Sequence, residues 1–366
     1  MTLQTPSGAA RQITYGMVAG ASVPVSMSHP AGAGAPASTT QYLHDANGNV
    51  IGEDLSTGSR TCRSYDQGRN FEQSRVEGLA TGGNCNVTAP GASLPAGARK
   101  TSMQWHPDWK YGVRVASPGG VVSFVYNGQP DPFNGNAVLN CAPSTALLPD
   151  GKPIAVLCKR VEQATTDATG AQGFNATLQA GVPAREWKWT YNAFGQVLTE
   201  DGPRTDVNDI TTYEYYTDTT ADHTKGDLKK VTNGVGQVTQ YTKYNPHGQV
   251  LESLDANNVL TVNTYDLRQR LLSTTVGGQA TTYTYDPVGQ LKKVTLPDTS
   301  WVGYDYDDAH RLVAVYDHKG NRTVYTLDNA GNREAEETSD PNGSLKRQLT
   351  RTMDALGRVQ QTKGRE

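Results

Sequence analysis

The chain of 366 residues lacks the sequence features that mark membrane proteins, nucleic-acid-binding proteins and ordinary secreted proteins. It has no stretch near the roughly 18 consecutive apolar residues that a membrane-spanning helix needs. Its formal net charge is −3 and charges of both signs are dispersed, so a basic surface for nucleic acid is not predicted. The N-terminal residues lack a basic start followed by an apolar run, so an ordinary secretory signal is not predicted either.

Phenylalanine is also scarce, with 5 residues against 18 tyrosines, a ratio that suits strands with one wetted face. In contrast, the 38 glycines and 19 prolines make up about one residue in six, which favours turns over long helices. The length by itself indicates roughly two or three domains.

A short unit recurs along the chain: an apolar or aromatic residue, Asp or Asn, two further residues, Gly, a polar residue, and Val or Leu. Its clearest copy is Tyr285-Asp286-Pro287-Val288-Gly289-Gln290-Leu291. The acidic or amide position falls at Asn192, Asn245, Asp266, Asp286, Asp307, Asp328 and Asp354, with steps of 21, 20, 21 and 21 residues from Asn245 to Asp328. Self-similarity at this period predicts an array of like supersecondary units.

Each unit is predicted to be one β-hairpin. The segment Asp286-Pro287-Val288-Gly289 has the preferences of a type I turn, because Asp bonds the backbone two residues on, Pro presets the second φ, and Gly suits the last position. The preceding residues 281–285 alternate Thr and Tyr at the period of a strand. The copies at Asp266 and Asp307 have lost the Gly, which predicts looser turns. Because a lone hairpin is marginal in water, the units are expected to pair edge to edge.

The array predicts an all-β fold of tandem hairpin repeats that pair into a curved, spiral or barrel-like shell sheet. Residues 185–366 hold the regular array. Residues 41–184 hold degenerate copies, such as the one at His44-Asp45, that are interrupted by insertions. Residues 1–40 are rich in Gly, Ala, Ser and Pro, which predicts a loose or joining segment.

Four cysteines are spaced as two pairs, Cys62 with Cys85 and Cys141 with Cys158. Each pair brackets an insertion rich in Gly, Pro or Asn, so two disulfides in an oxidising compartment are predicted. Four unpaired thiols in a reducing compartment are the alternative. None of the spacings is typical of a tetrahedral zinc site.

Several groups of polar residues have some features of functional sites but are interpreted as parts of the repeat. Asp45-Ala46-Asn47-Gly48-Asn49 has oxygen ligands at alternate positions, as a calcium loop does, but it lacks the later bidentate Glu and is itself a repeat turn. His106-Pro107-Asp108-Trp109 and Asp307-Asp308-Ala309-His310 place His near Asp without a nucleophile or a catalytic signature. Adjacent carboxylates such as Glu336 and Glu337 are expected to point apart along a strand. The sequence therefore predicts no catalytic residue, no cofactor-binding residue and no metal ligand.

The aromatic residues leave a second function open. The tyrosines and five tryptophans could form a surface on which sugars stack, although aromatic side chains on a sheet more often pack against one another. The tryptophans are Trp105, Trp109, Trp187, Trp189 and Trp301.

The repeat resembles that of the YD-repeat, or Rhs, family of bacterial proteins, whose hallmark is Tyr-Asp followed by x-x-Gly-Arg-Leu at a period near 21. The segments that carry the resemblance are Tyr285 to Leu291, Tyr306-Asp307-Asp308-Ala309-His310-Arg311-Leu312 and Asp354-Ala355-Leu356-Gly357-Arg358-Val359. It covers residues 185–366 firmly and 40–130 weakly. The resemblance implies a hollow shell of spiralling hairpins around a toxin, released by self-cleavage and delivered to other cells by a contact-dependent secretion machine.

The resemblance thus implies a non-enzymatic structural wall that encapsulates and helps to deliver a C-terminal or partner toxin in bacterial competition. The implied partners are the toxin cargo, the remainder of the shell and a secretion-spike protein, without nucleic acid and without a membrane span. The implied location is secreted or cell-surface, by a signal-independent route from the cytoplasm. The sequence lacks the family's Asp-Pro-x-Gly-Leu cleavage site, and ends at Gly364-Arg365-Glu366 within the array, so a shell fragment or truncated member is expected. A secreted or cell-surface glycan-binding or adhesion module is the alternative.

The residues nominated by this interpretation are structural. They are the turn anchors Asp286, Asp307 and Asp328 and the hairpin tyrosines Tyr285 and Tyr306. The sequence does not predict which face of the sheet carries the tyrosines.

Overall fold

The computed structural model describes residues 2–4, 10–29, 37–329, 331–353 and 359–365 of the chain. Regular structure in these residues is almost entirely β-strand, with two short 3-10 helices, η1 (Cys85–Thr88) and η2 (Gly173–Asn175). The all-β prediction is therefore confirmed. The predicted turn that begins at Asp354 lies outside the described residues.

The strands of the first half are longer and less even than those of the second. They are β1 (Thr2–Gln4), β2 (Ala10–Val18), β3 (Ala21–His29), β4 (Ser38–His44), β5 (Val50–Asp54), β6 (Ser59–Asp66), β7 (Phe71–Ala80), β8 (Arg99–Trp105), β9 (Gly112–Ser117), β10 (Gly120–Tyr126), β11 (Gln129–Asp131), β12 (Ala137–Leu139) and β13 (Leu157–Ala164).

The strands of the second half follow one another mostly through short turns, with longer loops at residues 202–210 and 216–227. They are β14 (Arg185–Tyr191), β15 (Val197–Asp201), β16 (Thr211–Tyr215), β17 (Leu228–Thr232), β18 (Val238–Tyr244), β19 (Val250–Leu254), β20 (Leu260–Tyr265), β21 (Leu271–Val276), β22 (Gln279–Tyr285), β23 (Leu291–Thr295), β24 (Trp301–Tyr306), β25 (Leu312–Asp317), β26 (Arg322–Leu327), β27 (Arg333–Ser339), β28 (Leu345–Met353) and β29 (Val359–Arg365).

The strands form one antiparallel sheet of 27 strands and a separate two-stranded hairpin, β11 with β12. Each strand of the large sheet pairs with the next one along the chain, except that β10 pairs with β13 across the β11–β12 hairpin. A meander of this kind needs only hairpin connections, which the Gly-, Asn- and Asp-rich turns supply.

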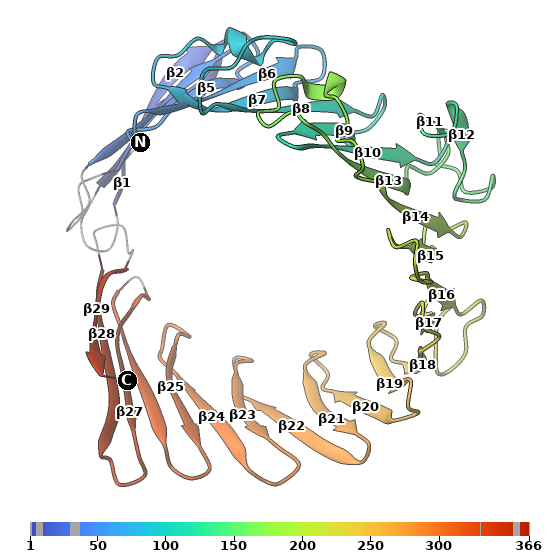
Figure 1. The fold of residues 1–366 in the computed structure, drawn as a ribbon. Coiled ribbons are helices and arrows are strands. Elements are labelled where there is room, and N and C mark those ends of the chain that lie inside the picture. The colour runs from blue at the N-terminus through green and yellow to red at the C-terminus, as the bar shows by residue number, and fades with distance from the viewer. Residues whose placement is uncertain (1, 5–9, 30–36, 330, 354–358, 366) are drawn as a thin grey trace.

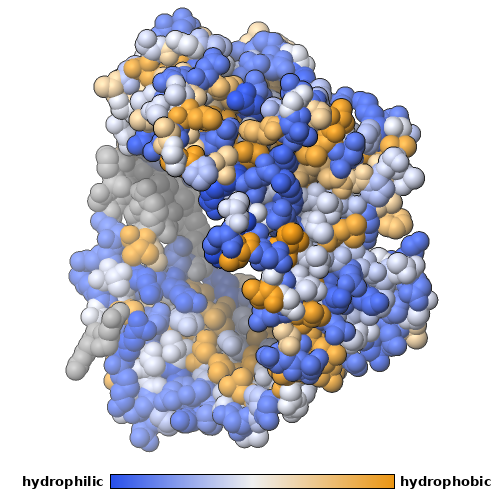
Figure 2. Space-filling model, turned by 45° about the vertical axis from the view of Figure 1, so that its right-hand side comes forward, coloured by the Kyte–Doolittle hydropathy of each residue, from blue (hydrophilic) through white to orange (hydrophobic). Residues whose placement is uncertain are grey.

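The sheet curves into a ring that is almost complete, as Figure 1 shows. The structure records pairing of β1 with β2 and of β29 with β28 but none between β1 and β29, so hydrogen bonds do not close the ring among the described residues. The space-filling view in Figure 2 shows a hollow between the upper and lower arcs, with hydrophilic and hydrophobic side chains mixed over the visible surface. The chain is thus a wall one sheet thick around an open centre.

Part of the N-terminal segment belongs to the wall. Residues 1–40 were predicted to be loose, yet β2 and β3 pair through seven residues of register around the turn at Ala19 and Gly20, and β3 continues onto β4. The small residues that suggested a loose segment alternate with Ile13, Tyr15 and Val25, which suit strands.

Fully buried side chains are concentrated between residues 41 and 184. Cys62, Val76, Leu79 and Ala98 form a small core, with Cys85, Val87 and Leu94 of the following insertion packed against it. In residues 185–366, by contrast, the buried apolar residues of the described part are Tyr244, Ala314 and Leu349. Most of the array therefore has no second layer.

Candidate functional site

The turn of each repeat is held by the side chain of its Asp or Asn. Asp286 Oδ1 accepts the backbone N–H groups of Gly289 and Gln290, both at 2.8 Å, and Asn245 Oδ1 accepts those of His247 and Gln249, both at 3.0 Å. The fourth residue of the turn has a positive φ, such as +106° at Gly289. This geometry is a type I turn followed by a left-handed residue, a common closure of β-hairpins. The anchor role predicted for Asp286 is consistent with these contacts.

The expectation of looser turns at Asp266 and Asp307 was wrong. Gln269 and His310 adopt the left-handed conformation of the missing Gly, with φ of +65° and +63°. Their N–H groups still bond the carbonyl of the anchor residue at 2.9 and 2.8 Å. Arg270 and Arg311 compensate, since each guanidinium forms an ion pair with its anchor carboxylate, at 2.6 and 2.7 Å.

These ion pairs also change the acidity of the anchors. Hydrogen bonds from Arg270, with its backbone N–H the largest contribution, hold the pKa of Asp266 below its ordinary value. The side chain of Arg311 does the same for the pKa of Asp307. Both carboxylates therefore keep their charge to a lower pH than an ordinary Asp does.

Successive turns are tied to one another by the residue four places after the anchor. Gln249 Nε2 donates to the carbonyl of Gln269 at 3.0 Å, Gln290 Nε2 to that of His310 at 2.8 Å, and Arg311 Nη1 to that of Asp328 at 2.8 Å. Each bond reaches from one repeat to the turn of the next. The row of turns along this rim is thus a hydrogen-bonded ladder.

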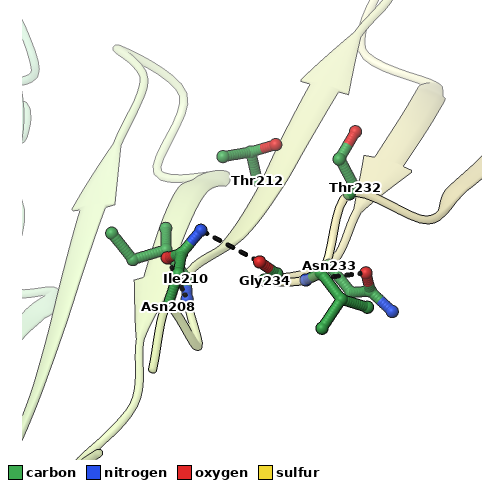
Figure 3. A pocket seen from close by; sticks show the side chains of 8 residues that line it. Asn208, Ile210, Thr212, Thr232, Asn233 and Gly234 are labelled. Atoms are coloured by element: carbon green, nitrogen blue, oxygen red, sulfur yellow. Dashed lines mark hydrogen bonds between the residues drawn. The ribbon is translucent and has the colours of Figure 1, made fainter. Parts of the chain in front are cut away.

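The opposite rim has Asx anchors that the sequence analysis missed. Asn233 and Asp255 bond the backbone N–H groups two and four residues on, and Asp317 and Asp340 do the same. Figure 3 shows the turn at Asn233 beside Asn208, whose Nδ2 donates to the carbonyl of Gly234 at 3.0 Å. The signal was present in the sequence, because Asn233 and Gln237 repeat the pairing of Asn192 and Gln196.

The hairpin tyrosines tie each repeat to the preceding one. The hydroxyl of Tyr285 donates to the carbonyl of Leu271 at 2.9 Å, and that of Tyr306 donates to the carbonyl of Leu291 at 3.0 Å. In both cases the acceptor is the first residue of the strand that follows the previous anchor turn. The other tyrosines with this contact among the described residues are Tyr65, Tyr126, Tyr191, Tyr215, Tyr244 and Tyr265. The position therefore favours Tyr over Phe, because its hydroxyl satisfies a backbone carbonyl.

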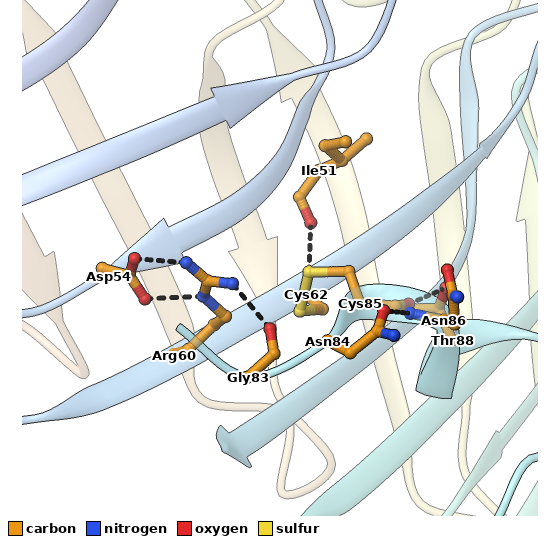
Figure 4. The surroundings of a disulfide bond; sticks show 9 residues. All are labelled: Ile51, Asp54, Arg60, Cys62, Gly83, Asn84, Cys85, Asn86 and Thr88. Carbon is orange, nitrogen blue, oxygen red and sulfur yellow. Dashed lines mark hydrogen bonds and ion pairs between the residues drawn. A yellow bond between two sulfur atoms is a disulfide. The ribbon is translucent and has the colours of Figure 1, made fainter. Parts of the chain in front are cut away.

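Both predicted disulfides are present, Cys62 with Cys85 and Cys141 with Cys158. Figure 4 shows the first one pinning the insertion that carries η1 onto β6, with Arg60 paired to Asp54 and bonded to the carbonyl of Gly83 beside it. Figure 1 places η1 and η2 on the outside of the ring, and in Figure 4 the far arc lies behind the sheet. The face that carries Cys62 is therefore the convex face.

The strand register extends this assignment around the ring. Residues that pair directly across two strands share a face of the sheet, and neighbours along one strand alternate between faces. Following the pairs from strand to strand therefore places one set of residues on the same convex face as Cys62. This set includes Val76, Ser102, Ser123, Lys188, Thr212, Ser273 and Thr282. Tyr283 and Tyr285 consequently lie on the concave face. The residues of that face in the array include Trp187, Tyr213, Tyr241, Tyr283, Tyr304 and Tyr325.

The two faces differ in character. In β22 the concave residues Thr281, Tyr283 and Tyr285 are half-buried, whereas the convex Thr282 and Thr284 are exposed. Aromatic rings on the inside of the curve are accompanied by ion pairs, among them Arg63 with Glu53 at 2.9 Å. Burial raises the pKa of Tyr191 to about 12, so this concave phenol remains a neutral donor.

In the segment that resembles a calcium loop, the side-chain oxygens of Asp45 are engaged in the turn itself. Asp45 Oδ1 accepts the N–H groups of Asn47 and Asn49 at 2.9 Å, while Oδ2 accepts from the side chains of Asn49 and Gln67. Within the described residues, no three His, Cys, Asp or Glu side chains are grouped so that they could hold a metal ion.

The His and Asp candidates also have structural partners. His106 is 3% exposed, its Nδ1 accepts the N–H groups of Asp108 and Trp109, and burial lowers its pKa. His310 faces Gln290 at 3.2 Å while Asp307 bonds Arg311. These contacts give the residues roles in the turns.

The adjacent carboxylates diverge as expected. Glu336 pairs with Arg347 at 3.1 Å on the concave face, and Glu337 accepts from Gln348 at 2.7 Å on the other. A glycosidase needs two carboxylates on either side of the same glycosidic bond, and two carboxylates on opposite faces of a strand cannot take these positions.

Two of the tryptophans, Trp187 and Trp301, have neighbours on their rings. Guanidinium groups of Arg160 and Arg185 lie over Trp187 at 4.7 and 4.9 Å, and Lys293 and Tyr316 cover Trp301. The structure thus places packing partners where a stacked sugar would have to lie on these two rings.

The pocket in Figure 3 is an open cleft of about 550 Å³ between the Asn233 turn and residues 208–212. Its lining is neutral, with Asn208, Thr212, Thr232 and Asn233 as its polar side chains. No titratable group lines it, so it offers no acid–base chemistry. No helix of the described residues is long and apolar enough to cross a membrane.

The geometry defines a class of protein: a curved single-sheet wall of hairpin repeats with an aromatic concave face. The RHS Repeat family signature matches residues 265–300 and 306–345. This part of the chain is therefore a stretch of RHS repeats, and the resemblance to the Rhs, or YD-repeat, family is confirmed. No curated protein sequence matches the chain.

Solved structures share the fold over nearly the whole chain. A crystal structure of TcdB2-TccC3-Cdc42 has 15% sequence identity and a TM-score of 0.62, covering 94% of this chain and 18% of that one. One of TcdB2-TccC3 has the same identity and TM-score at 96% and 19% coverage. A Photorhabdus luminescens Tc holotoxin pore with a TccC3 mutation has 15% identity and a TM-score of 0.63 at 94% and 18%. The chain thus spans less than a fifth of the length of these structures.

Proposed function

We propose that this chain is a section of the non-enzymatic wall of an Rhs-type shell, which encloses a toxin polypeptide and carries it out of the cell. The RHS repeats and the fold both support a structural role of this kind. The partners would be the toxin and the remainder of the shell, with export by a signal-independent route. The observation that carries the proposal is the difference between the two faces of one continuous curved sheet.

The concave face has the chemistry to hold an unfolded or partly folded polypeptide. Half-buried tyrosines such as Tyr283 and Tyr304 present rings with a polar edge, and ion pairs such as Arg347 with Glu336 interrupt the apolar surface. Such a mixture contacts many side chains weakly and without a preferred sequence. The convex face, with threonines such as Thr282 and Thr284, would face solvent.

The contacts of the candidate residues support the non-enzymatic part of the proposal. The carboxylates of Asp307 and Glu336 and the ring of His106 are all engaged in turns or ion pairs. The mechanism would be steric, since a wall that surrounds a polypeptide separates it from everything outside.

The test is photocrosslinking from the two faces of one strand. A photoreactive phenylalanine derivative replaces Tyr283 on the concave face or Thr282 on the convex face of the protein in its native cells. The complex is isolated after irradiation, and crosslinked polypeptides are identified by mass spectrometry. We expect a crosslink from position 283 to a polypeptide that is toxic when expressed alone, and none to it from position 282.

The neighbouring position is the control, because both variants change the same strand and the same peptide. A crosslink from position 282 alone, or no crosslink from either position in a folded protein, would overturn encapsulation by the concave face.

A further inference from the structure

A pocket on the convex face has groups that the wall does not need for its own folding. It has a volume of about 460 Å³ and lies over β6 to β9, between the two insertions that carry η1 and η2. Its lining includes Lys100, Ser102, Gln104, Arg114, Gln172 and Phe174. They come from three separate segments, namely β8, β9 and the loop that carries η2, and the sheet register pairs β8 with β9.

Lys100 is a buried cation without an acidic partner. The residue is 2% exposed, and its Nζ donates to the carbonyl of Ala89 at 2.6 Å and, weakly, to that of Val87 at 3.5 Å. It makes no ion pair with any described residue, and burial lowers its pKa. An ammonium has three N–H groups, so at least one remains for a ligand.

Arg114 adds a second cation whose donors are unused. Its guanidinium lies over the ring of Phe174 at 4.7 Å and makes no hydrogen bond or ion pair within the described part of the chain. Cross-strand pairing sets it opposite Gln104, so both side chains rise from the convex face. A guanidinium carries five N–H donors in a fork that matches carboxylate and phosphate oxygens.

The charge in the pocket is not neutralised from within. Lys100 and Arg114 are the charged residues of the lining, and no carboxylate lines it. The buried carboxylate of the adjoining loop, Asp167, already accepts the N–H groups of Gly170 and Gln172 at 2.9 and 2.8 Å. Buried charges in proteins are normally paired, and the described residues of this lining supply no counter-charge to the two cations.

The rest of the lining suits hydroxyl groups. The side chains of Ser102, Gln104 and Gln172 make no hydrogen bond within the described residues, and each can both donate and accept. The volume is that of a site for a small ligand. We propose that this pocket binds a small anionic sugar, with Arg114 and Lys100 holding its carboxylate or phosphate group and the three polar side chains its hydroxyls.

The site is independent of the proposed enclosure of a toxin, because it opens on the convex face. It would let an assembled shell bind sugar-coated surfaces while its interior is filled. It also differs from a tryptophan platform, since recognition here rests on charge.

The test is thermal denaturation and calorimetric titration of the full chain with glucose 6-phosphate, glucuronate, glucose and inorganic phosphate. We expect one of the two acidic sugars to raise the melting temperature and bind, with glucose and phosphate at least about tenfold weaker, as the loss of charge-assisted bonds or of the hydroxyls requires. Arg114→Gln should weaken that binding about tenfold or more, without a large change in the unliganded melting temperature.

Arg185→Gln is the matched control, because Arg185 also stacks on an aromatic ring, Trp187, but lies outside the pocket. It should bind the sugar as the parent does. Ser102→Ala, which keeps the shape of the pocket, should weaken binding by a smaller factor. The proposal is overturned if neither acidic sugar binds, if phosphate alone binds equally well, or if Arg114→Gln leaves binding unchanged.

Discussion

Residues 41–184 and 185–366 build the same sheet by different physical means. In the first region the insertions cover the convex face, so that Val76 and Val161 are almost fully buried and Lys159 pairs with Asp131 below the surface. In the second region no second layer covers most of the sheet, and most side chains are exposed or half-buried. The sheet runs through both regions without a break.

The comparison shows that a covered face is not required for this fold. The regular array replaces a core by repeated local contacts, namely Asx turns, tyrosine–carbonyl bonds and bonds between successive turns. Each is worth about 1 kcal/mol net, but they recur from unit to unit in most of the array. The decorated region depends more on a few buried groups and on two covalent links. Changes there should be large and local, whereas changes in the array should be small and similar from unit to unit.

The largest effect is expected for Lys159→Met. The change leaves Asp131, which is 1% exposed, as a buried carboxylate without its partner at 2.7 Å. Breaking one side of such a pair costs about 3–5 kcal/mol in the free energy of unfolding, measured by denaturant titration. Lys188→Met is the control, because Lys188 pairs with Glu186 at a more exposed position and should change stability by less than about 1 kcal/mol. Equal losses in the two variants would contradict the contrast.

Removing the disulfide Cys62–Cys85 should have the next largest effect. The bond joins residues 23 apart, and its loss in a Cys62→Ala, Cys85→Ala variant should cost about 2–4 kcal/mol. Hydrogen exchange followed by mass spectrometry should show faster exchange in residues 81–98 and no change in 185–366. Faster exchange throughout the array would show that the two regions are not energetically separate.

Acidification should destabilise the decorated region through Asp54. The hydrogen bond from Arg60 lowers the pKa of Asp54 below its ordinary value. A lowered folded pKa means that the stabilisation is present above the unfolded pKa near 3.9 and is lost as the pH falls through the folded pKa. Protection factors around β5 and β6, which correct for the slower intrinsic exchange of amides in acid, should therefore fall below about pH 4. In Asp54→Asn this part of the pH dependence should disappear, and an unchanged profile would contradict the assignment.

The array should respond modestly to Tyr285→Phe. The change removes the hydroxyl bond to Leu271, and leaves that carbonyl to find another donor, at a cost of about 0.5–1.5 kcal/mol. Tyr306→Phe should cost a similar amount, because its bond to Leu291 is equivalent. The two variants should behave alike in denaturant titrations; a large difference between them would argue against equivalent units.

The smallest expected effect has the opposite sign. Gln269→Gly should stabilise the protein by about 0.5–1 kcal/mol, because Gln269 holds φ at +65°, which costs a residue with a Cβ more than Gly. Gly248→Ala is the matched reverse change at φ +77°, where a Cβ would meet no other atom, and should destabilise by a similar amount. Thermal denaturation of both variants measures the two changes in stability. Opposite signs of similar size are expected if the backbone conformation, rather than side-chain packing, is their cause.

Much of this organisation could be predicted from the sequence because it is local. The period of the turn anchors predicted the hairpins. The spacing of Cys62, Cys85, Cys141 and Cys158 predicted both disulfides. The turns at Gln269 and His310 were predicted wrongly because their compensation comes from Arg270 and Arg311, whose ion pairs a search for Gly does not consider.

Other features depend on distances that the sequence does not contain. Whether Tyr283 lies on the concave or the convex face depends on the direction in which the whole sheet curves. That direction results from the twist between all pairs of neighbouring strands. The pocket at Lys100 and Arg114 draws on residues from 64 to 175, so no short motif marks it. The second rim at Asn233 was detectable, but its spacing is less regular than that of the Tyr-Asp units.

The nearest-neighbour pairing of the strands has a consequence for how such walls change over generations. Because each hairpin of the array mainly contacts the ones before and after it, a DNA segment encoding about 21 residues can be duplicated or deleted without rearranging the others. Each event adds or removes two strands, or about 9.5 Å of circumference at the usual strand spacing. The size of the enclosed space can therefore evolve in fixed steps, by copying one module rather than by remodelling a core.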